Sequence, residues 1–228
     1  MRYFAIPILL LGLILGACSG NLRQSTLQSN YPAMYSNPPA AILIIPPDNR
    51  TTAVDAREYF SCSLSEAIGK MGYYVIPVEA VYDVLRDEGL YDHISLEPPV
   101  LKNLKDNFGA DAILVSEITQ WDKAWFLTSG SLTIGANFRL LSTQTGAQIW
   151  DYSSRIKVRL ESSSEGFLGS VIDSALKTAI EDYFQHARSS NLKTFASGLP
   201  FGKYHPKFNT DMERYVPPTR HLDITISK

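Results

Sequence analysis

The sequence predicts a mixed α/β fold, in which helices pack on a sheet of parallel and antiparallel strands. A strand, an amphipathic helix and a second strand follow one another within residues 40–77, a spacing typical of a parallel β-α-β unit. Residues 112–160 then change to an apolar period of two, which is typical of an antiparallel meander. A wide apolar helical stripe follows at residues 167–184. The expected element order is therefore β-α-β-α-α-β-β-β-α.

Residues 1–17 have the organisation of a bacterial lipoprotein signal peptide. Arg2 provides the charged end, residues 3–15 form an almost unbroken apolar run, and the tetrapeptide LGAC at 15–18 matches a lipobox. The apolar run is shorter than the about 20 residues that a transmembrane helix needs. We therefore predict cleavage before Cys18 and attachment of lipid to its thiol. An ordinary secretory signal and a short membrane anchor are the alternatives.

Composition and charge narrow the location and the partners of the predicted mature chain. It has no second apolar span, so we expect the lipid on Cys18 to be its membrane anchor. Ser19, rather than Asp, follows Cys18, which by similarity to other lipoproteins favours the outer membrane, with the domain in the periplasm or exposed at the surface. Cleavage removes Arg2 and no acidic residue, which leaves 20 basic against 23 acidic residues. This balance argues against binding to nucleic acid or to an anionic bilayer.

The chain divides into one expected domain with a segment on either side. Residues 18–39 are polar and rich in Ser, Asn, Gln and Pro, so we expect a flexible tether there. Residues 40–188 carry the periodic patterns and are expected to form the α/β domain. Residues 189–228 contain Gly, Pro and isolated aromatic residues, which indicates an extended C-terminal tail.

The first half of the domain is expected to contain two short strands and three helices. The strands are residues 40–46, which end at a Pro-Pro pair, and residues 73–77. Apolar residues at helical spacing predict the buried faces of the helices. These faces are Phe60, Leu64, Ala67, Ile68 and Met71; then Val78, Val81, Tyr82 and Leu85; and then Leu101, Leu104 and Phe108.

The second half is expected to form three strands and the last helix. Residues 112–121 begin with an apolar run, which is typical of a sheet covered on both faces. Residues 132–140 and 150–160 alternate between apolar and polar positions and are joined by a turn at 143–146. Residues 122–131 exceed a tight hairpin, so we expect a loop there.

Cys62 and three aromatic residues are candidate interface residues. Cys62 is a lone thiol once the other cysteine is lipidated, so no intrachain disulfide is expected. The favoured interpretation of Cys62 is a small buried apolar residue. Its position opposite the apolar face of its helix gives some support to the alternative, a contact between subunits. Trp121, Trp125 and Phe126, at and within the expected loop, suit a partner contact, with packing over the sheet edge as the alternative.

The sequence shows no recognisable catalytic or metal-binding constellation. The four histidines are scattered without a cysteine partner or helical i, i+4 spacing. Neither a G-x-S-x-G elbow nor a P-loop is present. Asp48, Asp55 and Glu58 could gather at a helix start, where the helix dipole favours carboxylates in any case. We therefore expect no enzyme, no cofactor and no metal, although acid pairs formed by folding leave no trace in a sequence.

Several short motifs together resemble a bacterial lipoprotein family of unknown function that includes a Gram-negative vaccine-candidate antigen. Beyond the lipobox, they are IPP at 45–47 with Asn49, GYYVIPV at 72–78, GADA at 109–112, Trp121, TQTG at 143–146 before Trp150, and LPFG at 199–202. The resemblance implies a fold similar to the TolB amino-terminal domain, LpoB and the CsgG periplasmic domain, with a capacity to form homodimers. It implies no catalytic residues, and it does not extend beyond about Phe208.

These features predict a non-enzymatic, outer-membrane-anchored periplasmic lipoprotein that docks on other envelope proteins. The family's members are typically encoded beside a CsgG-like lipoprotein, so the resemblance implies an export or surface-assembly complex. The chain lacks the transmembrane hairpins with which the curli exporter forms a pore, so we do not expect it to form one alone. The alternative is a periplasmic receptor for a small ligand or peptidoglycan fragment, which predicts a pocket lined by aromatic side chains.

Overall fold

The computed structural model describes residues 25–92, 94–126, 129–161 and 183–227, which fold around one mixed sheet. The strand order is β3-β1-β4-β5-β6-β7, and β2 also pairs with β4. The strands are β1 (Ala41–Ile44), β2 (Asp48–Asn49), β3 (Tyr74–Val75), β4 (Ala112–Phe126), β5 (Ser129–Ser142), β6 (Gln148–Glu161) and β7 (His221–Ser227). The β4-β5-β6 meander is antiparallel and the other pairings are parallel. The predicted mixed α/β fold is confirmed.

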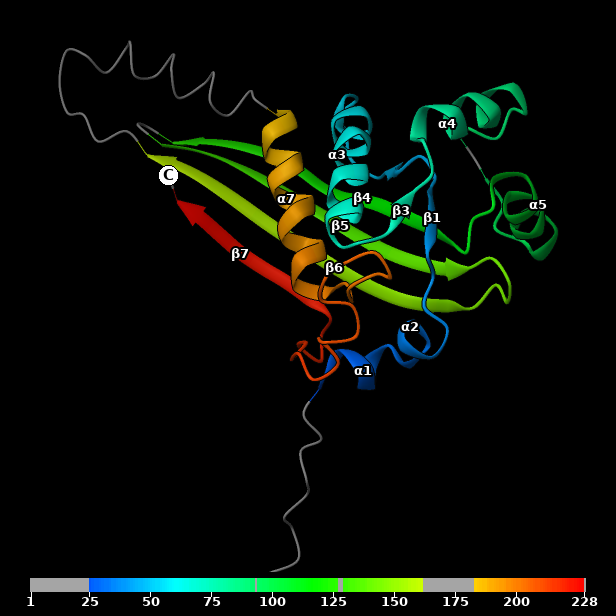
Figure 1. Ribbon diagram of the computed structural model, residues 1–228. Helices are drawn as coiled ribbons and strands as arrows, with labels where there is room; N and C mark the ends of the chain where they lie inside the picture. Colours follow the sequence, from blue (N-terminus) through cyan, green and yellow to red (C-terminus); the bar gives the residue numbers. More distant parts are fainter. Residues whose placement is uncertain (1–24, 93, 127–128, 162–182, 228) are drawn as a thin grey trace, which may run out of the picture.

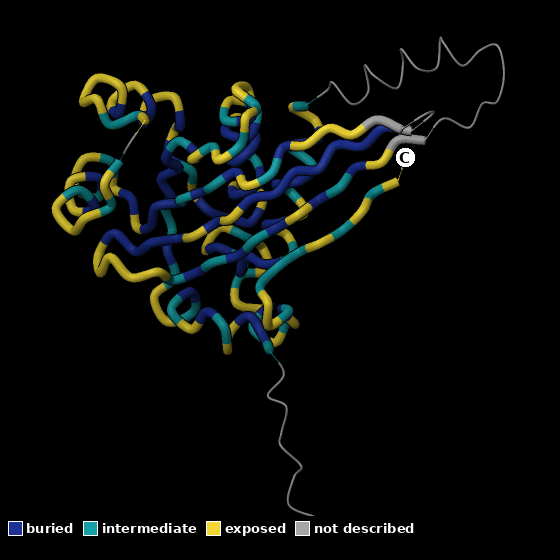
Figure 2. The backbone as a smooth tube through the Cα atoms, turned by 180° about the vertical axis from the view of Figure 1, so that it is seen from behind, coloured by how far each residue is buried: buried dark blue, intermediate teal, exposed yellow. Residues whose placement is uncertain are grey.

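Helices cover one face and one end of this sheet. They are α1 (Leu27–Asn30), α2 (Pro32–Ser36), α3 (Ala56–Lys70), α4 (Val78–Asp87), α5 (Pro98–Phe108) and α7 (Tyr183–Gly198). Figure 1 shows α3 and α7 side by side across the sheet, with α4 and α5 beyond β1 and β3. No helix of the described residues crosses the opposite face of β6 and β7, as the view from behind shows (Figure 2).

The β-α-β unit forms as its spacing predicts. β1 and β3 are parallel neighbours, with Ala41 opposite Tyr74, and α3 crosses between them. The predicted apolar face of α3 is buried, and Phe60, at its N-terminal end, is fully inaccessible to solvent. The Phe60 ring stacks on Phe138 of β5, with 5.8 Å between ring centroids. Burial of this face therefore fixes α3 against the middle of the sheet.

The meander has the predicted alternation of buried and exposed positions. On the face toward α3 and α7, β5 and β6 bury the residues that the period of two selects. These are Leu132, Ile134, Ala136, Phe138 and Leu140 in β5, and Trp150, Tyr152, Ser154, Ile156 and Val158 in β6. The opposite positions are exposed or half-buried in β6 and at Asn137 and Arg139 of β5, whereas Ser131 and Thr133 in the first half of β5 are buried as well. The core therefore lies between the sheet and the pair of helices.

Helix α7 joins the sheet through rings and one close backbone contact. Phe195 lies edge-on to Phe138, with 4.8 Å between centroids, and Trp150 Nε1 donates a hydrogen bond to the Gly198 carbonyl at 2.9 Å. A Cβ atom at Gly198 would overlap the ring of Tyr152. Gly198 thus allows the end of α7 to approach β6 more closely than any other residue would.

The expected tether is wrong for residues 25–39, which are part of the folded domain. Leu27, Tyr31 and Met34 of the α1–α2 segment are almost completely buried. The Leu27 amide donates to the Arg214 carbonyl at 2.9 Å, and the Tyr31 hydroxyl donates to the Asp151 carbonyl at 2.6 Å. Helices of four and five residues are too short to show a period, so their tertiary partners decide their conformation.

The expected extended tail after residue 189 is also wrong. Helix α7 continues to Gly198, and β7 adds a parallel strand to β6, with Ile156 opposite Ile224. Polar residues of α7 that obscure its period are buried because they contact other elements; Asn191 Nδ2, for example, donates to Ser63 Oγ of α3 at 2.8 Å. Most of the strong helix expected at 167–184 lies outside the described residues.

The loop expected at residues 122–131 is also wrong, because most of these residues belong to strands β4 and β5. β4 runs on to Phe126 and β5 begins at Ser129, with Trp125 opposite Gly130. Polar residues here lie in an extension of the sheet in which β5 pairs with both β4 and β6, so that backbone ladders hold the strands together.

Candidate interaction surface

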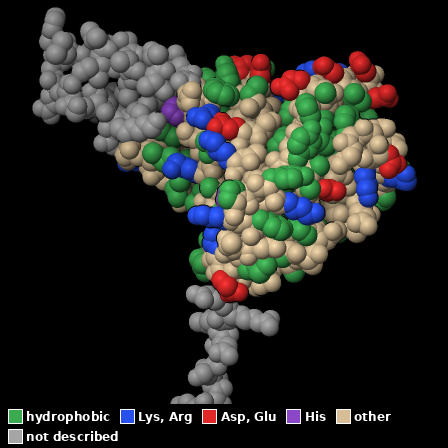
Figure 3. Space-filling model, in the orientation of Figure 1, with side chains coloured by type: hydrophobic (Ala, Val, Ile, Leu, Met, Phe, Trp, Pro, Cys, Tyr) green, Lys and Arg blue, Asp and Glu red, His purple; other side chains and the backbone are tan. Residues whose placement is uncertain are grey.

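A hollow lies between α3, β3 and α4, and we call it the α3–α4 groove. Its volume is about 670 Å³. Its lining includes Val54, Cys62, Val75, Pro77, Tyr82 and Tyr91. Figure 3 shows hydrophobic side chains gathered between α3 and α4, with acidic side chains along the top of the molecule above them. The hollow is large enough for a small ligand or for several side chains of a partner.

Two tyrosines and two arginines form one end of the groove. Tyr82 and Tyr91 meet edge to face, with 5.5 Å between centroids and 79° between planes. The guanidinium carbon of Arg86 lies 4.5 Å from the centre of the Tyr91 ring, and that of Arg57 lies 5.8 Å from it. Both distances are within the range of cation–π attraction. Tyr91 thus lies within the attraction of two cationic groups.

The basic side chains of the groove have ion-pair partners, whereas two of its acidic side chains have none among the described residues. Both arginines already have acidic partners, since Arg57 pairs with Asp92 at 2.8 Å and Arg86 pairs with Asp83 at 3.0 Å. Among the described residues, no basic side chain pairs with Glu58 or Glu79, which also line the groove. The unbalanced charge that the groove presents is therefore negative.

The floor of the groove contains a hydroxyl with no hydrogen bond. Tyr82 is only 7% exposed, and its hydroxyl has no hydrogen-bond partner among the described residues. The Ser61 hydroxyl, which donates to the Arg57 carbonyl at 2.6 Å, lies near enough to lower the pKa of Tyr82 but outside hydrogen-bond geometry. Burial is the main cause that raises the pKa of Tyr82 to about 12, so the group stays protonated. An unused donor at this depth can bond to an acceptor that enters the groove.

Residues of the open face of the sheet line a second hollow of about 490 Å³. Most of its charged groups pair with one another, and Arg139 is without an ion pair among the described residues. Arg50 pairs with Asp48 at 2.8 Å and with Glu117 at 3.1 Å, and Asn137 donates to Glu117 at 2.9 Å. The pKa of Glu117 is lowered first by the bond from Asn137 and then, against the effect of burial, by Arg50. Arg220 pairs with Asp151 at one end of this hollow. Because these groups pair with each other, this face offers less to a partner than the α3–α4 groove.

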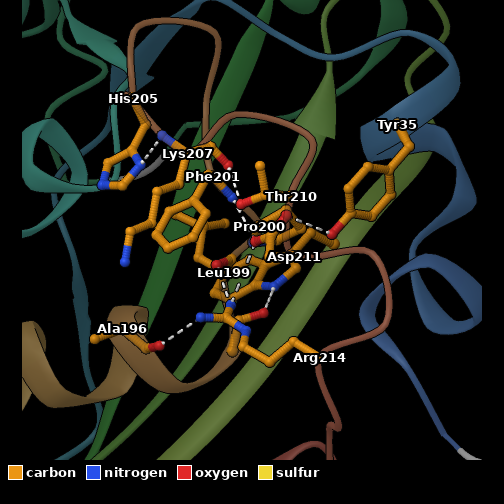
Figure 4. A network of polar contacts seen from close by, with 12 residues as sticks. Tyr35, Ala196, Leu199, Pro200, Phe201, His205, Lys207, Thr210, Asp211 and Arg214 are labelled. Carbon is orange, nitrogen blue, oxygen red and sulfur yellow. Dashed lines mark hydrogen bonds and ion pairs between the residues drawn. The ribbon is translucent and has the colours of Figure 1, made fainter.

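A buried carboxylate at Asp211 connects three separate parts of the chain (Figure 4). Its oxygens accept hydrogen bonds from the Phe201 amide at 2.9 Å and from the Tyr35 hydroxyl at 3.1 Å. Arg214, 3.8 Å from the same carboxylate, donates to the Ala196 and Leu199 carbonyls at the end of α7. The cluster therefore joins α2, the end of α7 and the segment before β7, which is a structural role.

The structure separates the four predicted interface residues. Cys62 is exposed and lines the α3–α4 groove, so the favoured interpretation as a buried residue is wrong. Trp121 is only 7% exposed, and its ring lies 6.1 Å from that of Tyr183. It packs within the core, which contradicts its assignment as an interface residue. Trp125 and Phe126 lie in β4 with side chains that are not described, and Cys18 lies outside the described residues.

The sequence did not point to the other groove residues. Tyr82 belongs to a predicted apolar stripe, but nothing in that stripe marks its hydroxyl as unpartnered. Glu58 was expected to gather with Asp48 and Asp55, whereas Asp48 faces the opposite hollow. The excess of acidic over basic residues across 53–92, eight against three, is the one signal that could have indicated this surface.

Within the described residues, no helix is both long and apolar enough to cross a membrane. Likewise, no three His, Cys, Asp or Glu side chains of this part of the chain come together in a way that could hold a metal ion.

Comparison with known families identifies the chain. The profile of the family described as "Putative lipoprotein GNA1162-like" matches residues 29–198, most of the chain. The chain belongs to this family. A putative lipoprotein of Neisseria meningitidis serogroup B is 26% identical over 164 residues, which are 72% of this chain and 75% of the relative. The resemblance drawn from the sequence motifs is thereby confirmed.

Three solved structures are similar to this member of the GNA1162-like family. Lipoprotein GNA1162 from Neisseria meningitidis is 25% identical, with a TM-score of 0.47 over 63% of this chain and 99% of that one. PelC from Paraburkholderia phytofirmans, solved as a dodecamer, is 16% identical, with a TM-score of 0.42 over 69% and 87%. The LpoB C-terminal domain from Salmonella enterica is 19% identical, with a TM-score of 0.37 over 57% and 94%.

Proposed function

We propose that this protein is a non-enzymatic lipoprotein, anchored to the outer membrane through lipid on Cys18, whose domain binds other envelope proteins. The observation that carries the proposal is the α3–α4 groove, an open surface of apolar walls and unpaired carboxylates. Membership of a lipoprotein family supports the anchor. Anchoring confines the domain near its partners and raises their effective concentration without new contacts.

The proposed partner is a CsgG-like lipoprotein or another component of an export or surface-assembly complex. The lipobox and the family resemblance support a place in the envelope, with the domain in the periplasm. A homodimer is compatible with this arrangement, because one surface can bind a second copy while another binds a partner.

Photo-crosslinking in intact cells tests the proposal. A photoreactive residue replaces Val54, which is 88% exposed at the rim of the groove, and a matched control replaces Tyr204, which is 67% exposed elsewhere. We expect the Val54 position to crosslink an envelope protein identified by mass spectrometry, and we expect Cys18→Ser to abolish this product. Equal capture from both positions, or none from Val54, would contradict the proposed binding surface.

A second candidate, a receptor for a small ligand or peptidoglycan fragment, is favoured by the volume of the groove and by its two tyrosines. It predicts that a purified muropeptide raises the melting temperature of the protein in proportion to the logarithm of its concentration. No shift at saturating muropeptide would leave the protein-binding proposal as the better one.

A further inference from the structure

We propose that the α3–α4 groove binds an extended peptide segment of the partner, in which apolar side chains alternate with Lys or Arg. This inference rests on the proposed function, because it gives the binding surface a chemical class of ligand. Three features of the groove support it: its uncompensated negative charge, its apolar walls and the free edge of β3.

The charge favours a cationic ligand. The two arginines of the groove are paired with acidic groups, whereas Glu58 and Glu79 have no basic partner among the described residues. Residues 53–92, which include α3, β3 and α4, contain eight acidic and three basic residues. A Lys or Arg of a partner would complete these ion pairs, and an anionic segment would be repelled.

The walls favour apolar side chains beside those cations. Val54, which lines the groove, is 88% exposed. A bound peptide would cover this apolar surface and bring an acceptor to the unpartnered Tyr82 hydroxyl. A peptide carries backbone carbonyls at every residue, so it can supply that acceptor whatever its side chains are.

The free edge of β3 favours an extended conformation. β3 is the outer strand on its side of the sheet. The amides of Tyr74 and Ile76 donate to the Ala40 and Ile42 carbonyls, at 2.9 and 3.0 Å. Val75, between them, therefore directs its own N–H and C=O away from β1, and it also lines the groove. An added strand can pair there while its alternate side chains enter the groove.

Binding of synthetic peptides to the full-length protein in detergent tests the proposal. The probes are peptides of about eight residues, long enough to pass along β3, with alternating Leu and Lys, Leu and Glu, or Ser and Lys. We expect saturable binding of the Leu–Lys peptide and at least about tenfold weaker binding of the other two. A Leu–Lys peptide with an N-methyl group on every backbone nitrogen should also bind weakly, because neither of its edges can donate hydrogen bonds to β3.

Two matched variants place the peptide in the groove. Glu58→Gln with Glu79→Gln should weaken binding of the Leu–Lys peptide by about tenfold and reduce its dependence on salt. Asp87→Asn with Glu88→Gln removes the same charge from the exposed end of α4, outside the groove, and should have little effect. All four side chains are exposed, so folding should be preserved. Equal losses in both variants would show only a general attraction to an acidic surface and would overturn the proposal.

The Cys62 thiol provides an independent readout. We expect the Leu–Lys peptide to slow the modification of Cys62 by N-ethylmaleimide, and prior modification with a bulky maleimide to prevent peptide binding. Protection of Cys62 that rises with protein concentration, without peptide, would instead identify a second copy of the chain as the occupant. A muropeptide that protects Cys62 where the peptides do not would identify a small ligand.

The peptide experiment and the cellular experiment can fail separately. If crosslinking from Val54 captures an envelope protein but no peptide protects Cys62, the proposed function stands and the peptide inference is wrong. If the peptide binds but no cellular partner depends on Cys18, the groove has the proposed chemistry and the anchored-adaptor function is wrong.

Discussion

At the scale of single residues, the environment of Cys62 sets how its thiol reacts. Burial, followed by the nearby Glu58 and Glu79 carboxylates, raises the pKa of this thiol above its ordinary 9.0. Each cause disfavours the thiolate, because an anion loses hydration and faces like charge. The exposed sulfur is therefore accessible but poorly nucleophilic at neutral pH.

We predict that N-ethylmaleimide modifies Cys62 more slowly than free cysteine at pH 8, and that the rate continues to rise above pH 9. Glu58→Gln should move this pH profile to lower pH, since one of the charges that oppose the thiolate is removed. Stopped-flow measurement of the modification rate against pH checks this, with Asp87→Asn as the control. An unchanged profile in Glu58→Gln would show that burial alone sets the reactivity.

Asp211 differs from Cys62, because its carboxylate is buried and already accepts hydrogen bonds from Tyr35 and Phe201. We predict that Asp211→Asn lowers the free energy of unfolding by about 2 kcal/mol, since the amide cannot accept the bonds from Tyr35 and Phe201 with the same charge assistance. Urea unfolding measures the difference. Asp83→Asn, which removes an exposed ion pair with Arg86, should cost less than about 1 kcal/mol; equal losses would contradict the structural role of Asp211.

At the scale of elements, an ion pair links the two helices that cover the sheet. Arg188 of α7 donates two hydrogen bonds to Glu66 of α3, at 2.5 and 2.6 Å, and Lys70 pairs with the same carboxylate at 2.7 Å. The bond from Arg188 is the main cause that lowers the pKa of Glu66 from 4.5 to about 2. Protonation of Glu66 therefore weakens the contact between α3 and α7.

The sign of this shift gives a prediction about acid stability. Because the folded pKa of Glu66 lies below its ordinary value, its contribution is complete above about pH 4.5 and is lost as the pH falls toward 2. Glu66→Gln should lower the urea midpoint at pH 6 and leave it less sensitive to acid between pH 4.5 and 2. Unfolding curves across this range for the natural protein, Glu66→Gln and the Asp87→Asn control decide the point. Parallel pH dependence in all three would contradict it.

At the scale of the whole molecule, β7 determines which strand edge the protein presents. It lies after the region that the family profile matches, and it covers the edge of β6 from Ser153 to Arg159. Besides the backbone ladder, Arg155 approaches Asp223 at 3.8 Å and Ser153 bonds to His221 at 2.7 Å. Without β7, the long edge of β6 would be open to pairing with another chain.

We predict that a chain ending at Arg220 stays folded but self-associates through β6. Its core should persist, because Trp150 and Tyr152 bury their rings against other elements, such as Phe195 and Tyr31, rather than against β7. Sedimentation velocity should show larger species than the full chain at equal concentration, while a chain that lacks only Lys228 should not. An unchanged distribution in the shorter chain would mean that β7 does not protect this edge.

Local periodicity accounts for the parts of the fold that were predictable. The buried faces of α3 and α4 and the buried positions of β5 and β6 were predicted correctly, because a buried side repeats with the geometry of its own element. Buried polar residues of α7 interrupt its apolar helical pattern. Asn191 is buried because it bonds to Ser63 of α3, and Thr194 because it bonds to the Ser190 carbonyl one turn earlier. Helical periodicity placed Cys62 correctly, opposite the buried face of α3, but no sequence pattern indicated the groove that Cys62 lines.

The sequence by itself determined the mixed α/β class, the order of the main elements, the family and the lipobox, because each depends on residues close together in the chain. Only the tertiary structure decided that residues 25–39 belong to the domain, that β7 covers β6 and that Trp121 is buried. It also decided where the unpaired charge lies. Glu58, Glu79, Tyr82 and Val75 meet because α3 crosses between two parallel strands and α4 follows the second. Contacts of that kind are set by packing across long sequence separations, which no local pattern records.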